Sequence, residues 1–153
     1  MHYLTVQDIL WINLQVTKKT QSFNYSKLEE ATFYQYGYGQ SASLLSQAGR
    51  VLSGFVKKKP FTSGNEATAF IASLAFLKLN GVEVNLSDET APSWIDRVSK
   101  DSSVATEAFV DIAANIPDFH EESEPHVREA VLAVLDAYPK TIARIARGMA
   151  MAV

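Results

Sequence analysis

Apolar residues recur at helical spacing along most of this chain. A stripe that repeats about every 3.6 residues marks the face of an α-helix that packs on a core. The pattern therefore predicts an all-α fold. The expected helices lie at about 6–18, 26–33, 41–59, 66–80, 102–116 and 127–138, with a short one from about Ser93 and a last one after Pro139.

Residues that start and stop helices bound these stripes. Thr5 followed by Asp8 is typical of a helix N-terminus, with the hydroxyl as cap and the acid in the first turn. Ser26 with Glu29 three residues later fits a capping box, so we expect the second helix to begin there. Pro60 ends the third, because the residue before a proline is driven out of the helical region.

The helix at 66–80 differs from the others because it has almost no polar face. A helix that is apolar all round is buried in the middle of its domain. Asn80 and Gly81 form its expected C-terminal cap. The turn that precedes it leads to unpaired N–H groups and the positive end of the helix dipole, which attract an anion. Its apolar residues are Ala67, Ala69, Phe70, Ile71, Ala72, Leu74, Ala75, Phe76, Leu77 and Leu79.

Composition excludes several classes of protein. The chain has 153 residues, of which 47% are hydrophobic, which suits a single domain over 1–153. Its 14 basic and 17 acidic residues give a net charge of -3, so we expect no nucleic-acid partner. The absence of cysteine excludes a disulfide scaffold, a thiolate zinc site and a cysteine nucleophile.

We expect a cytoplasmic protein with no membrane association. The first residues lack a basic stretch followed by an apolar run. The longest apolar-rich stretch, 67–79, is shorter than the roughly 20 residues that span a bilayer. The histidines of 120–126 stand in an acidic loop with irregular spacing, so no metal site is predicted there.

Two segments do not follow the helical pattern. Tyr34, Tyr36 and Tyr38 alternate before two glycines, which favours a turn or a small β flap. Residues 82–86 alternate between apolar and polar and indicate a short extended piece. Lys140 and Arg144 make the last helix basic, which suits either an ordinary terminal helix or a helix that binds a partner.

The run Lys59-Pro60-Phe61-Thr62-Ser63-Gly64-Asn65-Glu66-Ala67-Thr68 resembles the motif of the Fic/Doc (death-on-curing) family, His-Pro-Phe-x-Asp-Gly-Asn-Gly-Arg-Thr. The opening Leu4-Thr-Val-Gln-Asp-Ile-Leu10 and the Asn80-Gly81 end of the next helix add to the likeness, which covers about 3–90. The resemblance implies a Fic/Doc-like helical bundle around the helix at 66–80. Residues from about 102 to 153 would form a C-terminal helical extension.

The resemblance also implies a role for each position of the motif. Family members use the histidine as a base that activates a hydroxyl of a target protein for transfer of AMP or phosphate. Lys59 stands at that position, and a free lysine is protonated at neutral pH. Ser63 replaces the acidic residue that holds Mg²⁺, and Ala67 replaces the arginine that clamps phosphate. Glu66 places a negative charge where phosphates would lie, while Gly64 and Asn65 match the family.

The sequence therefore predicts a Fic/Doc-like, toxin-like protein with a degenerate active site that lacks AMP or phosphoryl transfer. Such a protein would act through a protein partner, either antitoxin-like or a target, and would need no cofactor. The alternative is an active transferase that uses ATP and Mg²⁺ with Lys59 and Ser63 as non-standard site residues. A third reading is a structural helical protein. In the family the segment of Tyr34, Tyr36 and Tyr38 docks the target, although packing on the core would equally explain these tyrosines.

Overall fold

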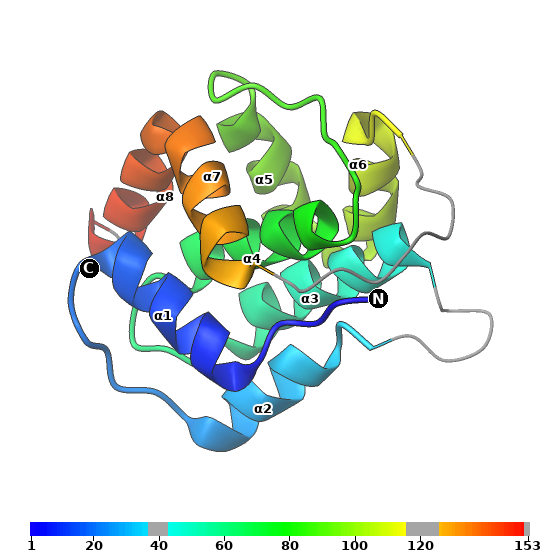
Figure 1. Ribbon diagram of the computed structural model, residues 1–153. Helices are drawn as coiled ribbons and strands as arrows, with labels where there is room; N and C mark the ends of the chain where they lie inside the picture. The colour runs from blue at the N-terminus through cyan, green and yellow to red at the C-terminus, as the bar shows by residue number, and fades with distance from the viewer. Residues whose placement is uncertain (37–42, 116–125, 152–153) are drawn as a thin grey trace.

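The all-α prediction is confirmed. The computed structural model describes residues 1–36, 43–115 and 126–151, and within them only two isolated β-bridges interrupt the helical architecture (Figure 1). The elements are α1 (Val6–Thr17), α2 (Tyr25–Phe33), α3 (Leu44–Lys58), α4 (Asn65–Leu79), α5 (Ala91–Lys100), a 3₁₀ turn (Ser102–Val104), α6 (Ala105–Ile112), α7 (Val127–Ala137) and α8 (Pro139–Met151).

Helix α4 runs through the hydrophobic core. It packs against α3, α1, α7 and α8, and Figure 1 shows it crossing the middle of the molecule. Phe70 and Phe76 have no exposed surface, and Phe70 contacts the rings of Trp94 and Tyr138 edge-on. Its apolar sequence on every side follows from these neighbours, because each face of the helix meets another helix.

The observed helix boundaries correct some of the expected ones. The Thr5 capping box with Asp8 is present. The capping box expected at Ser26 is wrong, because Asn24 has the extended backbone of a cap and its side chain accepts a hydrogen bond from the Lys27 N–H. The third helix begins at Leu44 instead of 41, and α6 ends at Ile112 instead of 116.

The helices after residue 102 pack on the same core as those before it. Phe109, Val131 and Tyr138 belong to one continuous cluster with the buried residues of α1, α3 and α4. Pro139 breaks the helical stripe as predicted and is the first residue of α8. The Asp88 carboxylate accepts hydrogen bonds from the Lys140 and Thr141 N–H groups, at 3.0 and 2.9 Å, and so caps α8 from a distant loop.

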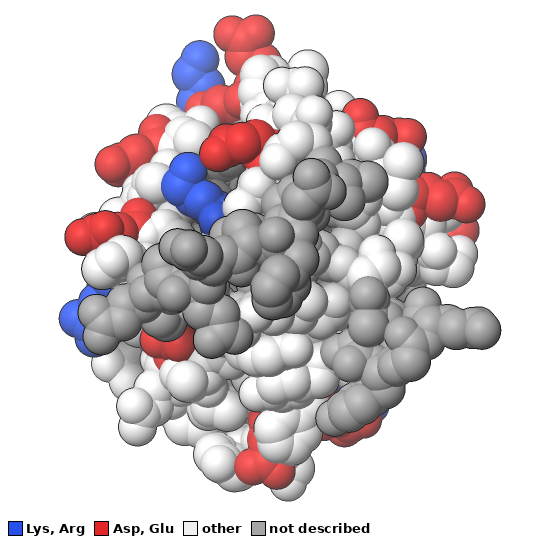
Figure 2. All heavy atoms as spheres, turned by 45° about the vertical axis from the view of Figure 1, so that its right-hand side comes forward, with Lys and Arg blue, Asp and Glu red and all other residues white. Residues whose placement is uncertain are grey.

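Charged side chains lie around the described part of one face of the molecule. On the face that Figure 2 presents, basic and acidic side chains are interspersed and do not form a continuous basic surface among the described residues. None of the helices in the described part of the chain combines the length and hydropathy that crossing a bilayer requires.

Candidate functional site

The motif run forms a tight turn between α3 and α4. Lys59 caps the C-terminus of α3 in the left-handed conformation, with φ of 47°, and it is exposed to solvent. Pro60 and Phe61 then turn inward and are buried. Gly64 begins α4 with φ of 78°, a value that favours glycine, so the match to the family at this position has a local backbone cause.

Asn65 closes this turn on itself. Its side-chain oxygen accepts a hydrogen bond from the Phe61 N–H at 2.9 Å, and its side-chain nitrogen donates to the Phe61 carbonyl at 2.8 Å. Asn65 is 3% exposed and Phe61 4%, so water does not compete for these groups. Both polar atoms of the Asn65 side-chain amide therefore hold the turn.

Two residues of α1 close the other side of the turn. Asn13, which is 2% exposed, donates hydrogen bonds to the Ser63 carbonyl and to the Thr68 hydroxyl, both at 3.1 Å. A Cβ atom added to Gly64 would lie 2.4 Å from a Thr17 methyl group, so side chains already fill the space beside this glycine. Sequence reasoning missed Asn13, although a polar residue inside the buried stripe of the first helix was a usable signal.

Glu66 follows the motif turn and belongs to the first helical turn of α4. Burial raises the pKa of the Glu66 carboxyl above its usual value, and the negative charge of Asp96 raises it further, while Lys59 opposes both. The candidate residues Lys59 and Glu66 therefore lie close enough for their opposite charges to interact. Glu66 is half-buried, and burial disfavours its ionised form. Its position in the motif run is one at which the family resemblance implies phosphate.

The raised pKa of Glu66 makes stability depend on pH. Folded protein holds the Glu66 proton more tightly than unfolded protein, so ionisation above the usual pKa destabilises the fold. We expect the Glu66→Gln variant to gain stability over wild type as pH rises from about 4 to 7. Urea unfolding at several pH values in this range measures the difference in free energy of unfolding between the variant and wild type. The matched control is Glu107→Gln, an exposed glutamate in the first turn of α6. A stability difference that does not grow with pH would contradict the prediction.

The remaining motif positions differ in exposure. Ser63 is half-buried and its carbonyl is taken by Asn13. Lys59 is exposed. Ala67 is 0% exposed, so the position that the family gives to an arginine lies inside the core.

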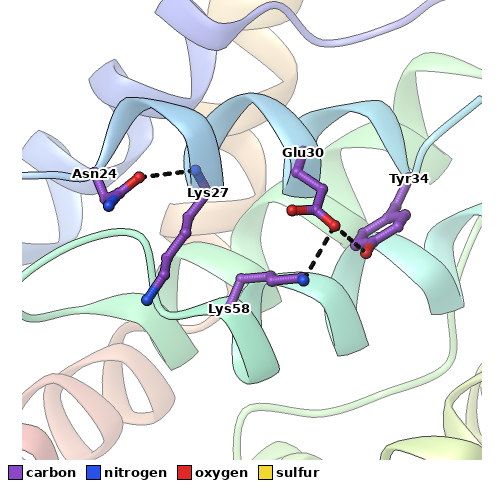
Figure 3. A network of polar contacts seen from close by, with 5 residues as sticks. All are labelled: Asn24, Lys27, Glu30, Tyr34 and Lys58. Carbon is purple, nitrogen blue, oxygen red and sulfur yellow. Dashed lines mark hydrogen bonds and ion pairs between the residues drawn. The ribbon is translucent and has the colours of Figure 1, made fainter.

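Of the three tyrosines expected in a docking flap, the two that the structure describes, Tyr34 and Tyr36, contact the body of the protein. The Tyr34 ring lies against Gly54 of α3, where an added Cβ would meet it at 2.3 Å. Its hydroxyl donates to Glu30, which also pairs with Lys58 at 3.0 Å (Figure 3). These hydrogen bonds, from Lys58 first and then Tyr34, lower the pKa of Glu30.

Tyr36 also packs on the fold. Its ring lies 4.4 Å from that of Tyr3, and its carbonyl accepts a hydrogen bond from Arg50. Tyr38 lies outside the described residues. Docking of a target at these tyrosines stays a prediction, while the two that are described serve in packing.

The connection between α1 and α2 pairs with the motif turn. Phe23 and Phe61 form an isolated antiparallel bridge, flanked by hydrogen bonds from Asn24 N–H to the Pro60 carbonyl and from Thr62 N–H to the Ser22 carbonyl. The two phenylalanine rings lie 6.1 Å apart on one face of the bridge. The motif turn is therefore held by α1, by Asn65 and by this connection.

Metal ligands do not gather in the described residues: they contain no group of three or more His, Asp or Glu side chains that would hold an ion. Residues 120–125 of the acidic loop lie outside them. Searches against protein-family models, curated proteins and solved structures found no match to this chain.

Proposed function

We propose that this chain is a Fic/Doc-like protein that has lost nucleotide-dependent transfer and acts by binding another protein. The observation that carries the proposal is the packing of side chains around the start of α4. Asn13 and Thr17 fill the space beside Gly64, and Asn65 is committed to Phe61. A helix N-terminus binds phosphate only where its N–H groups face open space.

The charges at this position support the same proposal. A phosphate that approached α4 would meet the Glu66 carboxylate, with Asp96 close to it. Phosphoryl transfer depends on positive groups that neutralise the developing charge on the transferred phosphoryl. Within the motif run 59–68, Lys59 is the basic residue that would supply such a charge, and it is exposed.

An active transferase with non-standard residues remains the competing function. It would use Lys59 as base or phosphate contact and Ser63 as a neutral metal ligand. Mg²⁺ is usually held by one or two carboxylates together with the phosphates of its substrate. Glu66 is the carboxylate nearest to the turn in sequence, and burial disfavours its ionised form. No described contact favours this alternative over the loss of transfer.

Calorimetric titration with ATP and Mg²⁺ distinguishes the two functions. We expect no binding up to millimolar nucleotide, because side chains of α1 occupy the space beside Gly64 at the start of α4. The same sample is shown to be folded by circular dichroism. Micromolar binding that is lost in Lys59→Ala, and kept in the control Lys100→Ala at an exposed lysine of α5, would overturn the proposed loss of activity.

A further inference from the structure

The bridge between Phe23 and Phe61 leaves one of its two edges open. In an antiparallel bridge flanked by hydrogen bonds on both sides, the central residues direct their own N–H and C=O groups outward. The outward groups of Phe61 are taken by Asn65. The N–H and C=O of Phe23 make no hydrogen bond to any described residue, and residues 22–27 are exposed.

An apolar groove of about 250 Å³ lies beside this edge. Leu10, Trp11 and Leu14 of α1 form one wall, and Phe23 and Phe61 form the other. Leu14 is 40% exposed and Phe23 44%, so apolar surface is available to a partner. Figure 1 shows the α1–α2 connection on the outside of the molecule.

The rim of the groove is basic. Lys19 lines the groove, the neighbouring Lys18 is exposed, and the Arg128 guanidinium lies 4.9 Å from the centre of the Trp11 ring. The lining contains no acidic side chain. This positive rim favours an acidic ligand on a chain whose net charge is -3.

We propose that the Phe23 edge and this groove bind an extended, acidic–apolar segment of a partner protein. The segment pairs its backbone with the Phe23 N–H and C=O. A residue opposite Phe23 directs its side chain to the same face as Phe23 and Phe61, which is the face that lines the groove. An acidic residue two positions along the segment, whose side chain lies on the same face, meets Lys19. This inference rests on the proposed function in that it names the surface for protein binding.

The test is a selection of random peptides displayed on phage against the whole protein. We expect the selected peptides to carry an acidic residue two positions from an apolar one, so that both side chains face the groove. A synthetic copy with a methyl group on the pairing backbone nitrogen should bind about tenfold more weakly, as expected for the loss of a hydrogen bond. Failure to select any peptide, or selected peptides that tolerate this methyl group, would overturn the proposal.

Matched variants locate the binding surface. Leu14→Lys and Lys19→Glu should each weaken the selected peptides, whereas Leu132→Lys and Lys100→Glu, at an exposed leucine of α7 and an exposed lysine of α5, should not. Equal effects in the controls would overturn the assignment. Light scattering should show a monomer, and a dimer that Leu14→Lys separates would identify a second copy as the occupant instead.

The outcome is independent of the nucleotide titration. Peptides that fail to bind, together with absent nucleotide binding, would reject this surface and leave the loss of transfer in place. Nucleotide binding that depends on Lys59 would reject the proposed function, whatever the peptides do.

Discussion

Replacing Asn65 by alanine should lower the free energy of unfolding by about 2–4 kcal/mol. The change leaves the N–H and the C=O of Phe61 without partners, and each unsatisfied buried group costs roughly 1–3 kcal/mol. A domain of this kind has a total stability of only about 5–15 kcal/mol, so the loss is a large fraction of it. Urea unfolding followed by circular dichroism measures the change.

Asn115 provides the matched control, because it makes the same kind of double contact at the surface. Its side chain accepts from the Glu83 N–H at 2.7 Å and donates to the Gly81 carbonyl at 3.0 Å, yet the residue is exposed. Water replaces these bonds in Asn115→Ala, so we expect that variant to lose less than about 1 kcal/mol. Similar losses in the two variants would show that burial of the turn is not what makes Asn65 important.

Periodicity was sufficient to predict the helices because tertiary packing follows the same stripes. The apolar residues of α4 face α1, α3, α7 and α8. Because these neighbours surround the helix, its sequence has no polar side, and that feature can be read without the structure. Caps were harder to predict because several polar residues compete near one helix end. Asn24 and Ser26 are both good caps, and the extended backbone of the connection at Asn24 decides between them.

The packing around the candidate site could not be predicted from the motif. Gly64 and Asn65 match the family in sequence, but their roles here depend on residues far away along the chain. Asn13 and Thr17 reach the turn only because α1 packs against α4. The pairing of Phe23 with Phe61 likewise joins two loops that no local pattern connects. A motif supplies the residue types, whereas the packing decides whether there is room for a ligand.

The same packing determines whether the residues of the Fic/Doc motif can be introduced into this chain. The positions of Lys59, Ser63 and Glu66 are exposed or half-buried, so Lys59→His, Ser63→Asp and Glu66→Gly should leave the fold intact. The three changes supply the base and the metal ligand that the family uses, and they remove the negative charge at Glu66. They do not supply the phosphate clamp, which needs an arginine at position 67.

Ala67→Arg should destabilise the protein by more than about 4 kcal/mol. Ala67 is 0% exposed, so the arginine would overpack the core and bury a charge without a partner. The control Ala133→Arg, at an exposed alanine inside α7, should cost less than about 1 kcal/mol. Urea unfolding of both variants gives the comparison.

The four changes together then test the proposed loss of function. If the closed packing has replaced the phosphate site, the combined variant should be largely unfolded and transfer no label from ATP to a protein hydroxyl. A combined variant that folds and transfers label would show that the space for phosphate persists. In that case the packing of Asn13 and Thr17 beside Gly64 would not exclude phosphate, and the proposed loss of transfer would rest on the reacting side chains alone.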